Sequence, residues 1–173
     1  MSNGKGDFAK AHELSAGNEG GISKDTNDTG NYLKVKGDKK LSKIFVATRY
    51  GQTFGNWLSA NGKSTPKNKT EFENLAEEFG KVDEEGVKAS FKKQYWTKYN
   101  LDDIADADVA SNVYDAMINQ TYTLGGGGEQ KTLANVLTGL GYDVDKDTDF
   151  TTNKIAITAL NKAIDEKGAE AVN

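Results

Sequence analysis

The stretch Asp106 to Tyr122, D-A-D-V-A-S-N-V-Y-D-A-M-I-N-Q-T-Y, decides the fold class of this chain. Apolar side chains run along it in two neighbouring lines at helical spacing: Val109, Val113 and Met117, then Ala110, Tyr114 and Ile118. Two adjacent lines make a wide apolar face, so we predict a helix at the centre of the protein.

Shorter amphipathic segments surround this central helix in the sequence. Further helices are predicted over Gly4–Ala16, Thr70–Gly80, from Asp83 through Val87, Phe91 and Tyr95, over Leu133–Leu140, and around Ile155–Ile164. Thr70 and Glu73 match a capping box, which marks the start of the second of these helices. The pattern is typical of a mainly helical protein.

One segment has strand periodicity. Between Tyr32 and Val46 the residues Leu33 to Lys36 alternate, and Gly37-Asp38 suits a two-residue turn, so we predict a β-hairpin there. Residues Ala47–Gly55 are predicted as irregular chain or short strand, and Asn56–Lys69 as turn-rich. The expected architecture is a helical bundle around a central helix, with one small β-hairpin after the first helix.

Length and composition exclude several classes of protein. With 173 residues we expect one domain over residues 1–128, and a C-terminal helical segment over 129–173 packed on it. A net charge of −4 argues against a nucleic-acid-binding protein. Cysteine is absent and His12 is the single histidine, so thiolate chemistry and a two-histidine metal site are excluded, and we expect no metal and no cofactor.

The ends and the apolar runs suggest no membrane insertion. The first ten residues are polar and lack the apolar core of a secretory signal. No apolar run approaches the length of about 20 residues that a membrane span needs.

Glu19 is the best candidate for an acid catalyst. It follows Phe8 by eleven residues, and eleven helical steps return to within about 20° of the start, on the face that Phe8 buries. Burial and the helix C-terminus both disfavour a negative charge, which keeps a carboxyl group protonated near neutral pH. Glycosidic bond cleavage needs such a group. Asp28, nine residues on, is placed to position water or to stabilise positive charge on a sugar ring.

The residues around Glu19 resemble a family signature. Asn18-Glu19-Gly20-Gly21, then Asp25 and Asp28-Thr29-Gly30, are similar to the E-G-G-x-x-x-D-x-x-D-x-G motif of glycoside hydrolase family 108. The chain departs from this pattern in having Asn31 where a second glycine is usual. Members are N-acetylmuramidases found in phage endolysins and in related secretion-linked bacterial proteins. The resemblance implies a lysozyme-like α+β fold, with Glu19 as catalytic acid.

A second motif follows after an insertion, Tyr32 to Val46. Thr48, Tyr50, Gly51 and Thr53 resemble the family's G-x-T-x-Y-G-I-T element. The order of acid, aspartate and threonine also resembles the catalytic order of phage-type lysozymes. The resemblance therefore implies supporting catalytic roles for Asp28 and Thr48, and a place for Asp25 in substrate binding.

Two later stretches extend the resemblance along the chain. Phe91 to Trp96 is similar to the family's F-Y-K-x-x-Y-W stretch, and Val113 to Asn119 to its L-F-D-x-x-x-N helix. The last part, Leu133 to Leu160, resembles the start of the peptidoglycan-binding region that usually follows.

Four further residues are candidates for substrate contact. Tyr50 and Trp96 have rings that suit stacking on sugars, although aromatic residues at helical spacing are more often core. Asp115 and Asn119 form a polar line on the central helix, and the resemblance implies that this line faces a cleft. His12, one helical turn from Phe8, is interpreted as structural.

The Tyr32–Val46 segment is rich in lysine, at positions 34, 36, 39, 40 and 43. One interpretation is a solvated surface that protects a sheet edge. The other is contact with the carboxylates of peptidoglycan stem peptides, or with a partner protein. The first is preferred from the sequence alone.

The leading hypothesis is hydrolysis of the N-acetylmuramic acid to N-acetylglucosamine linkage of bacterial peptidoglycan. A lytic transglycosylase with the same acid is one alternative, and a structural or binding module of a phage particle or secretion apparatus is another. The resemblance implies a phage or bacterial protein made in the host cytoplasm, acting on the cell wall after release or delivery.

Overall fold

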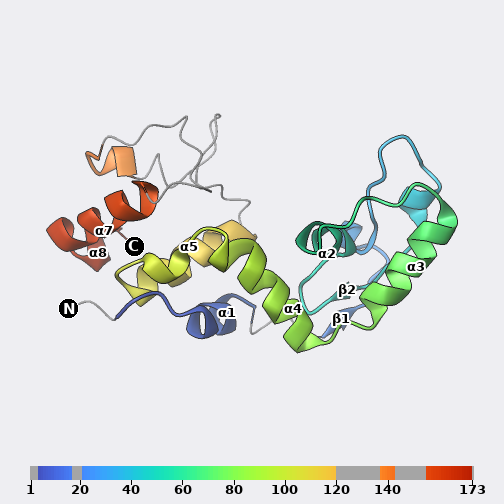
Figure 1. Cartoon of the computed structure of the whole chain (residues 1–173), viewed down its shortest axis with the longest axis horizontal. Coiled ribbons are helices and arrows are strands. Elements are labelled where there is room, and N and C mark those ends of the chain that lie inside the picture. Colours follow the sequence, from blue (N-terminus) through green and yellow to red (C-terminus); the bar gives the residue numbers. More distant parts are fainter. Residues whose placement is uncertain (1–3, 17–20, 120–136, 143–154, 173) are drawn as a thin grey trace. The chain divides into compact units, whose positions relative to one another are not determined.

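The computed structural model describes residues 4–16, 21–119, 137–142 and 155–172, and its chain divides into two compact units (Figure 1). Unit 1 comprises Met1–Ser15 and Gln94–Asn173, and unit 2 comprises Ala16–Lys93. The predicted boundary after residue 128 falls outside the described residues and stays a prediction. Within the described part, no helix is long and apolar enough to cross a membrane.

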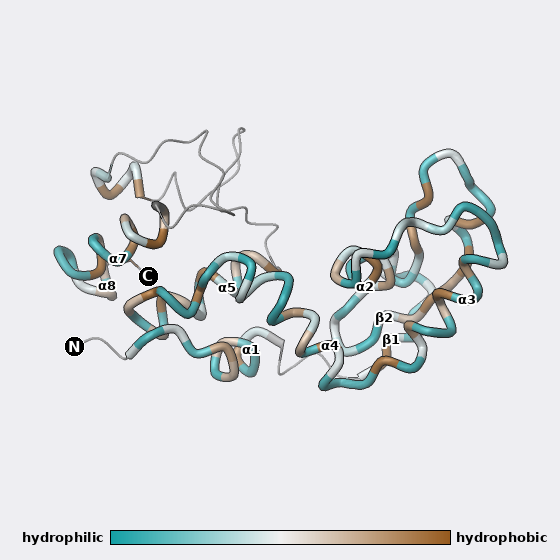
Figure 2. The backbone as a smooth tube through the Cα atoms, in the orientation of Figure 1, coloured by the Kyte–Doolittle hydropathy of each residue, from teal (hydrophilic) through white to brown (hydrophobic). Residues whose placement is uncertain are grey.

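Unit 1 is built around the predicted central helix, α5 (Ala107–Asn119). Its Val109, Ala110 and Tyr114 are at most 2% exposed, which confirms that this helix is the buried one. The other helices of the unit are α1 (Phe8–Ala16), α7 (Ile155–Lys167) and α8 (Ala169–Val172). Phe8 and Ala11 of α1 and Leu160 of α7 share one hydrophobic core with α5. In Figure 2, α1, α5 and α7 alternate between brown and teal along their turns, as expected for helices that bury one face.

The first helix begins later than the sequence predicts. Asp7 caps α1, because its Oδ1 accepts hydrogen bonds from the amides of Ala9 at 2.9 Å and Lys10 at 3.3 Å. Before the cap, Gly6 donates its amide to the Ile104 carbonyl at 3.0 Å. A Cβ at Gly6 would lie 2.2 Å from the carbonyl oxygen of Leu101, so only glycine allows this approach.

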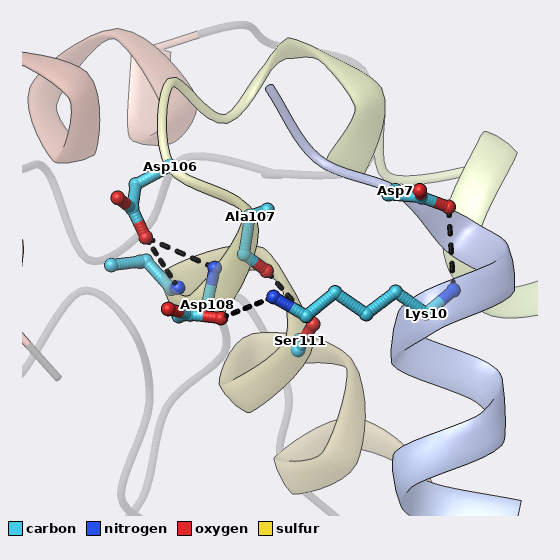
Figure 3. Close-up of polar contacts among 7 residues, drawn as sticks. Asp7, Lys10, Asp106, Ala107, Asp108 and Ser111 are labelled. Carbon is cyan, nitrogen blue, oxygen red and sulfur yellow. Dashed lines mark hydrogen bonds and ion pairs between the residues drawn. The ribbon is translucent and has the colours of Figure 1, made fainter. Parts of the chain in front are cut away.

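Polar contacts join α1 to the start of α5 (Figure 3). Asp106 caps α5 through its Oδ1, which accepts the amides of Asp108 at 3.0 Å and Val109 at 3.1 Å. The Lys10 ammonium lies 2.7 Å from the Asp108 carboxylate, and this hydrogen bond raises the pKa of Lys10. The pair is exposed, so its worth to stability is small.

A π-helix at Lys92–Thr97 changes which aromatic residue is buried. It continues from α4 (Glu84–Phe91), which Asp83 caps as predicted by accepting the Gly86 amide at 2.8 Å. The predicted stripe ran through Val87, Phe91 and Tyr95 at four-residue steps. Because a π turn takes five residues, Trp96 follows Phe91 into the interior instead, and Tyr95 is only half-buried.

Unit 2 contains the small antiparallel sheet, but not where the hairpin was predicted. Strands β1 (Ile22–Ser23) and β2 (Thr48–Arg49) pair with Ile22 opposite Arg49 and Ser23 opposite Thr48. Inside the segment Tyr32–Val46 the chain does reverse at Gly37, whose φ is +86°. Its two arms share a single isolated β-bridge, between Tyr32 and Phe45, in place of a strand ladder, and Leu41–Lys43 forms a 3-10 turn.

The helices of unit 2 are α2 (Phe54–Ala60), α3 (Lys69–Gly80) and α4. The sequence prediction of turn-rich chain was wrong for α2, which Thr53 caps and which buries Phe54 and Trp57. The capping box of α3 was also misplaced. Asn68, and not Thr70, is the cap: its Oδ1 accepts the Glu71 amide at 2.9 Å, and its Nδ2 donates back to Glu71 at 2.9 Å.

An aromatic cluster forms the core of unit 2. The Phe54 ring stacks on Trp57 with centroids 5.9 Å apart, and it meets Phe72 and Phe79 at 5.4 and 5.6 Å. Leu33 and Leu41 of the lysine-rich segment, both under 9% exposed, pack into the same core. The lysine-rich segment is therefore held by the same buried side chains as α2 and α3.

Candidate active site

Glu19 lies outside the described residues, and the structure of the chain resumes at Gly21. Gly21 has a φ of +65°, which glycine adopts readily, and its carbonyl accepts the Tyr50 amide at 2.7 Å. The next residue, Ile22, pairs with Arg49 in the sheet. The end of the E-G-G motif is thus anchored directly to the strand that carries Thr48.

The loop after β1 carries Asp25 and Asp28, both exposed. Each carboxylate organises its own turn: Asp25 Oδ1 accepts the Asn27 amide and Asp28 Oδ1 accepts the Gly30 amide, both at 2.8 Å. The loop is therefore a pair of consecutive aspartate-capped turns that fix the backbone at both acids. Both aspartates thus form turns, and both remain exposed to solvent.

Asn31 is fully buried and ties this loop to both strands. Its Nδ2 donates to the Asp25 carbonyl at 2.7 Å and to the Ser23 hydroxyl at 3.3 Å. Its Oδ1 accepts the Thr48 amide at 2.6 Å. One side chain thus sets the positions of the acid-bearing loop, β1 and β2 at once. In the sequence Asn31 stands out only because it replaces the second glycine of the family pattern, and that departure was the available signal.

Thr48 is half-buried in β2, and its hydroxyl is oriented inward. Its Oγ1 is buried and makes no hydrogen bond to any residue that the structure describes. A buried hydroxyl without a partner costs about 1–3 kcal/mol, so such atoms concentrate where a ligand or water binds. This is the property expected of a threonine that orients a reacting water.

Tyr50 lies in a strained turn after β2. Arg49 and Gln52 form a bridge around it, with the Arg49 amide 3.0 Å from the Gln52 carbonyl and the Gln52 amide 2.8 Å from the Arg49 carbonyl. Tyr50 and Gly51 have φ values of +46° and +77°, the left-handed region used by tight hairpins. A tyrosine there costs roughly 1–2 kcal/mol. The bond from its amide to Gly21 holds it in place, and its side chain is half-exposed.

Gln52 is a second buried polar residue that the sequence analysis missed. It is fully buried, and its Nε2 donates to the Ser90 hydroxyl of α4 at 2.6 Å. Its Oε1 has no hydrogen-bond partner among the described residues. Beside it, Arg49 Nε donates to the Val82 carbonyl at 2.9 Å, so two long-range bonds join the turn to the α3–α4 region. Gln52 stands where the family's Y-G-I-T element has isoleucine. A polar residue at this apolar position was the signal that the sequence offered.

Trp96 is not available to substrate, and its prediction as a sugar-stacking residue is corrected. The side chain is 0% exposed in the core of unit 1, with ring centroids 5.6 Å from Phe8 and 5.7 Å from Tyr114. Its Nε1 donates to Asp102 at 2.7 Å. With both ring faces covered, no sugar can stack on it, and the core interpretation holds.

The remaining predicted residues belong to unit 1. Asp115 is half-buried on α5, and Asn119 is the last residue of that helix, with its side chain outside the described part. Their contact with substrate stays a prediction. His12 stacks on Phe8 at 5.3 Å and its Nδ1 lies 2.8 Å from the Tyr114 hydroxyl, which agrees with its structural interpretation. In the described ranges no group of three or more His, Asp or Glu side chains is arranged to hold a metal ion.

Comparison with known proteins gives one match. A family model described as Glycosyl hydrolase 108 matches residues 13–120. The matched region contains Glu19, the Asp25–Asn31 loop, Thr48 and Tyr50, and it ends with α5. No curated protein and no solved structure matches the chain.

Proposed function

The chain belongs to the glycosyl hydrolase 108 family, and from this premise we propose that it cleaves the β-1,4 bond between N-acetylmuramic acid and N-acetylglucosamine with Glu19 as the general acid. Membership makes it a glycoside hydrolase of the lysozyme type that acts on peptidoglycan. The proposal concerns which bond is cut and which residues cut it.

The observation that carries the proposal is the hydrogen bond between the Tyr50 amide and the Gly21 carbonyl, at 2.7 Å. It connects the E-G-G motif to β2, and Asn31 connects β2 to the aspartate loop. Elements separated by almost thirty residues are thus drawn into one small framework that begins at Gly21, two residues after Glu19 in the sequence. Such a framework is what a set of catalytic groups needs, because small displacements of reacting groups cost rate.

In the proposed reaction the Glu19 carboxyl donates its proton to the glycosidic oxygen as the bond to the anomeric carbon breaks. The leaving sugar departs as an alcohol, and positive charge develops on the ring that remains. The Asp28 carboxylate, which is exposed, stabilises that charge or takes the proton from an attacking water. The inward Thr48 hydroxyl orients this water. At the end the water has supplied a hydroxyl to the anomeric carbon and a proton that restores the acid.

The test is clearing of purified cell walls by the wild-type protein and by Glu19→Gln. Glutamine keeps the size of the side chain but cannot donate an acidic proton, so we expect a loss of at least about 100-fold in rate. Glu13→Gln is the matched control, because Glu13 is an exposed carboxylate of α1, six residues before Glu19 in the sequence. Equal clearing by wild type and Glu19→Gln would remove Glu19 from the role of acid.

Mass spectrometry of the released fragments separates the proposed hydrolysis from the transglycosylase alternative. Hydrolysis leaves reducing sugar ends, whereas a transglycosylase leaves anhydromuramic ends. Binding to the walls without fragment release by the wild type would instead favour the structural-module alternative.

A further inference from the structure

The inserted segment Tyr32–Val46 carries an unusual charge for this protein. Five lysines and one aspartate give it a net charge of +4, while the whole chain has −4. All five lysines are exposed. None of them forms an ion pair with a described residue, whereas lysines 10, 63, 69 and 81 elsewhere do. The basic charge of this segment, which we call the lysine loop, is therefore not neutralised by neighbouring acids.

Protection of a sheet edge does not explain these lysines. That interpretation needs a strand with unpaired backbone groups to protect. Between the isolated bridge residues Tyr32 and Phe45 the chain forms turns and the Leu41–Lys43 3-10 turn, with no strand ladder. The segment therefore has no strand edge for its lysines to protect.

Hydrogen bonds of Ser42 and Asp38 order the lysine loop, and the lysine ammonium groups take no part in them. The Ser42 hydroxyl lies 2.9 Å from the Val35 amide, 3.1 Å from the Val35 carbonyl and 2.9 Å from the Asp38 carbonyl. Asp38, the one acid of the loop, uses its Oδ1 to accept the amides of Lys40 at 2.8 Å and Leu41 at 2.9 Å. The backbone that presents the lysines is thereby held before any ligand arrives.

Apolar side chains fix the same loop to the core of unit 2. Leu33 and Leu41 are buried there, and Val35 and Ile44 pack partly against it. Lys34 and Lys36 directly follow Leu33 and Val35 in the sequence, and hydrophobic and hydrophilic stretches alternate along the light-blue loop of Figure 1, as Figure 2 shows. A loop anchored in the core at positions 33, 35, 41 and 44 loses less conformational entropy than a free loop when its lysines bind a partner.

The base of the lysine loop adjoins the candidate active site. The Val46 amide donates to the Asn31 carbonyl at 2.8 Å, and the side chain of Asn31 holds the Thr48 amide. Tyr32 and Phe45 close the base as an aromatic pair with centroids 5.7 Å apart, and Phe45 is 37% exposed. A polymer bound across the active site therefore passes next to this loop.

We propose that the lysine loop binds the carboxylates of the peptide stems of peptidoglycan, on the same strand whose glycan is cut at the active site. Stem peptides end in carboxylates and recur along each strand, so a row of ammonium groups beside the cleavage site matches them in charge and in repetition. Exposed cations act over roughly 10 Å at about 0.1 M salt, which favours capture and orientation of the strand. The inference rests on the proposed function, because it takes peptidoglycan as the substrate.

The test compares two full-length variants with equal loss of charge. The loop variant carries glutamine at Lys36, Lys39 and Lys40, and the control variant carries it at three exposed lysines elsewhere, Lys5, Lys67 and Lys93. Both also carry Glu19→Gln to preserve the substrate. Cosedimentation with insoluble peptidoglycan freed of teichoic acids measures the apparent Kd.

At about 0.01 M salt we expect roughly tenfold weaker binding for the loop variant and little change for the control, and the difference should vanish near 1 M salt. Amidation of the stem carboxylates should weaken the parent protein to the level of the loop variant. Equal losses in the two variants, or undiminished binding to amidated peptidoglycan, would overturn the proposal. So would an effect seen only on walls that retain teichoic acids, since their phosphates would then be the ligand.

Hydrolysis of peptide-free glycan strands, with Glu19 intact, keeps this proposal separate from the proposed function. The lysine loop has no carboxylate to bind there, so the loop variant should cleave at the wild-type rate. A loop variant slowed on these strands would count against stem binding. Absence of cleavage by the wild type itself would instead count against the proposed function.

Discussion

Replacement of Asn31 by alanine tests whether this residue holds the candidate active site together. The side chain is fully buried and makes three hydrogen bonds, to Ser23, Asp25 and Thr48. Alanine removes all three and introduces no new polar group. The variant should therefore loosen the loop and both strands without adding a clash.

The magnitude follows from what each partner loses. The Asp25 carbonyl also accepts the Asp28 amide at 3.3 Å, and the Ser23 side chain is only half-buried, so each of these losses costs about 0.5–1 kcal/mol. The Thr48 amide loses its partner and adds about 1–2 kcal/mol. The free energy of unfolding should thus fall by about 2–4 kcal/mol, which at roughly 4–8 °C per kcal/mol for a unit of this size lowers its Tm by about 8–32 °C.

Tryptophan fluorescence can follow the affected unit by itself. The chain has two tryptophans, and Trp57 is buried in unit 2 while Trp96 is buried in unit 1. In a Trp96→Phe background the signal comes from Trp57 alone, so Asn31→Ala is compared with its parent in that background. Asn74→Ala is the matched control, since Asn74 is exposed on α3 of the same unit and its loss should change stability by less than about 0.7 kcal/mol.

Activity should fall together with stability. At a temperature where Asn31→Ala remains folded, displacement of Thr48 and of the aspartate loop should lower the clearing rate by about ten- to a hundredfold. A Tm within about 2 °C of the parent would refute the energetic argument, because it corresponds to less than about 0.5 kcal/mol. A large fall in Tm with full activity would refute the positioning role.

Further predictions concern glycine contacts and one tyrosine. Gly6→Ala should destabilise unit 1 by about 1–3 kcal/mol, because its Cβ would lie 2.2 Å from the Leu101 carbonyl oxygen, whereas Gly80→Ala in open space at the end of α3 should stabilise by about 0.5–1 kcal/mol. Thermal unfolding measures the stability of both variants. Equal changes in stability for Gly6→Ala and Gly80→Ala would contradict the proposed clash at Gly6. The pKa of Tyr142 is raised to about 12 by its hydrogen bond to Glu166, so its phenol should stay protonated until the pH rises through about 12. An ultraviolet difference titration of wild type against Tyr142→Phe should show that step, and a step near pH 10 would contradict it.

Local periodicity was enough for the long helices. The central helix, the burial of Phe8 and the start of a helix at Asp83 are confirmed, because each depends on residues within two or three helical turns of one another. Periodicity failed where neighbouring positions competed for one role, as Asn68 and Thr70 did for the cap of α3 and Tyr95 and Trp96 for the buried position. A π turn, which the spacing did not indicate, buries Trp96 fully in the core and leaves Tyr95 packed only partly against it.

The β-sheet escaped prediction for a different reason. Strands of two residues are too short to show alternation, and their pairing joins Ser23 to Thr48 across a loop and an insertion. The alternating stretch inside Tyr32–Val46 looked more like a strand, yet its apolar residues anchor a loop in the core of unit 2. Alternation reports which side chains are buried, and only the backbone partners decide whether a strand forms.

The sequence by itself determined that this protein is mainly helical and that Glu19, Asp28 and Thr48 are the residues to examine, because those conclusions rest on local spacing and on a family motif. Only the tertiary structure identified Asn31 and Gln52 as buried polar residues of the site. Their partners Thr48 and Ser90 lie 17 and 38 residues further along the chain. The free energy of a buried polar group depends on such distant partners, so it becomes visible only when the folded chain brings them together.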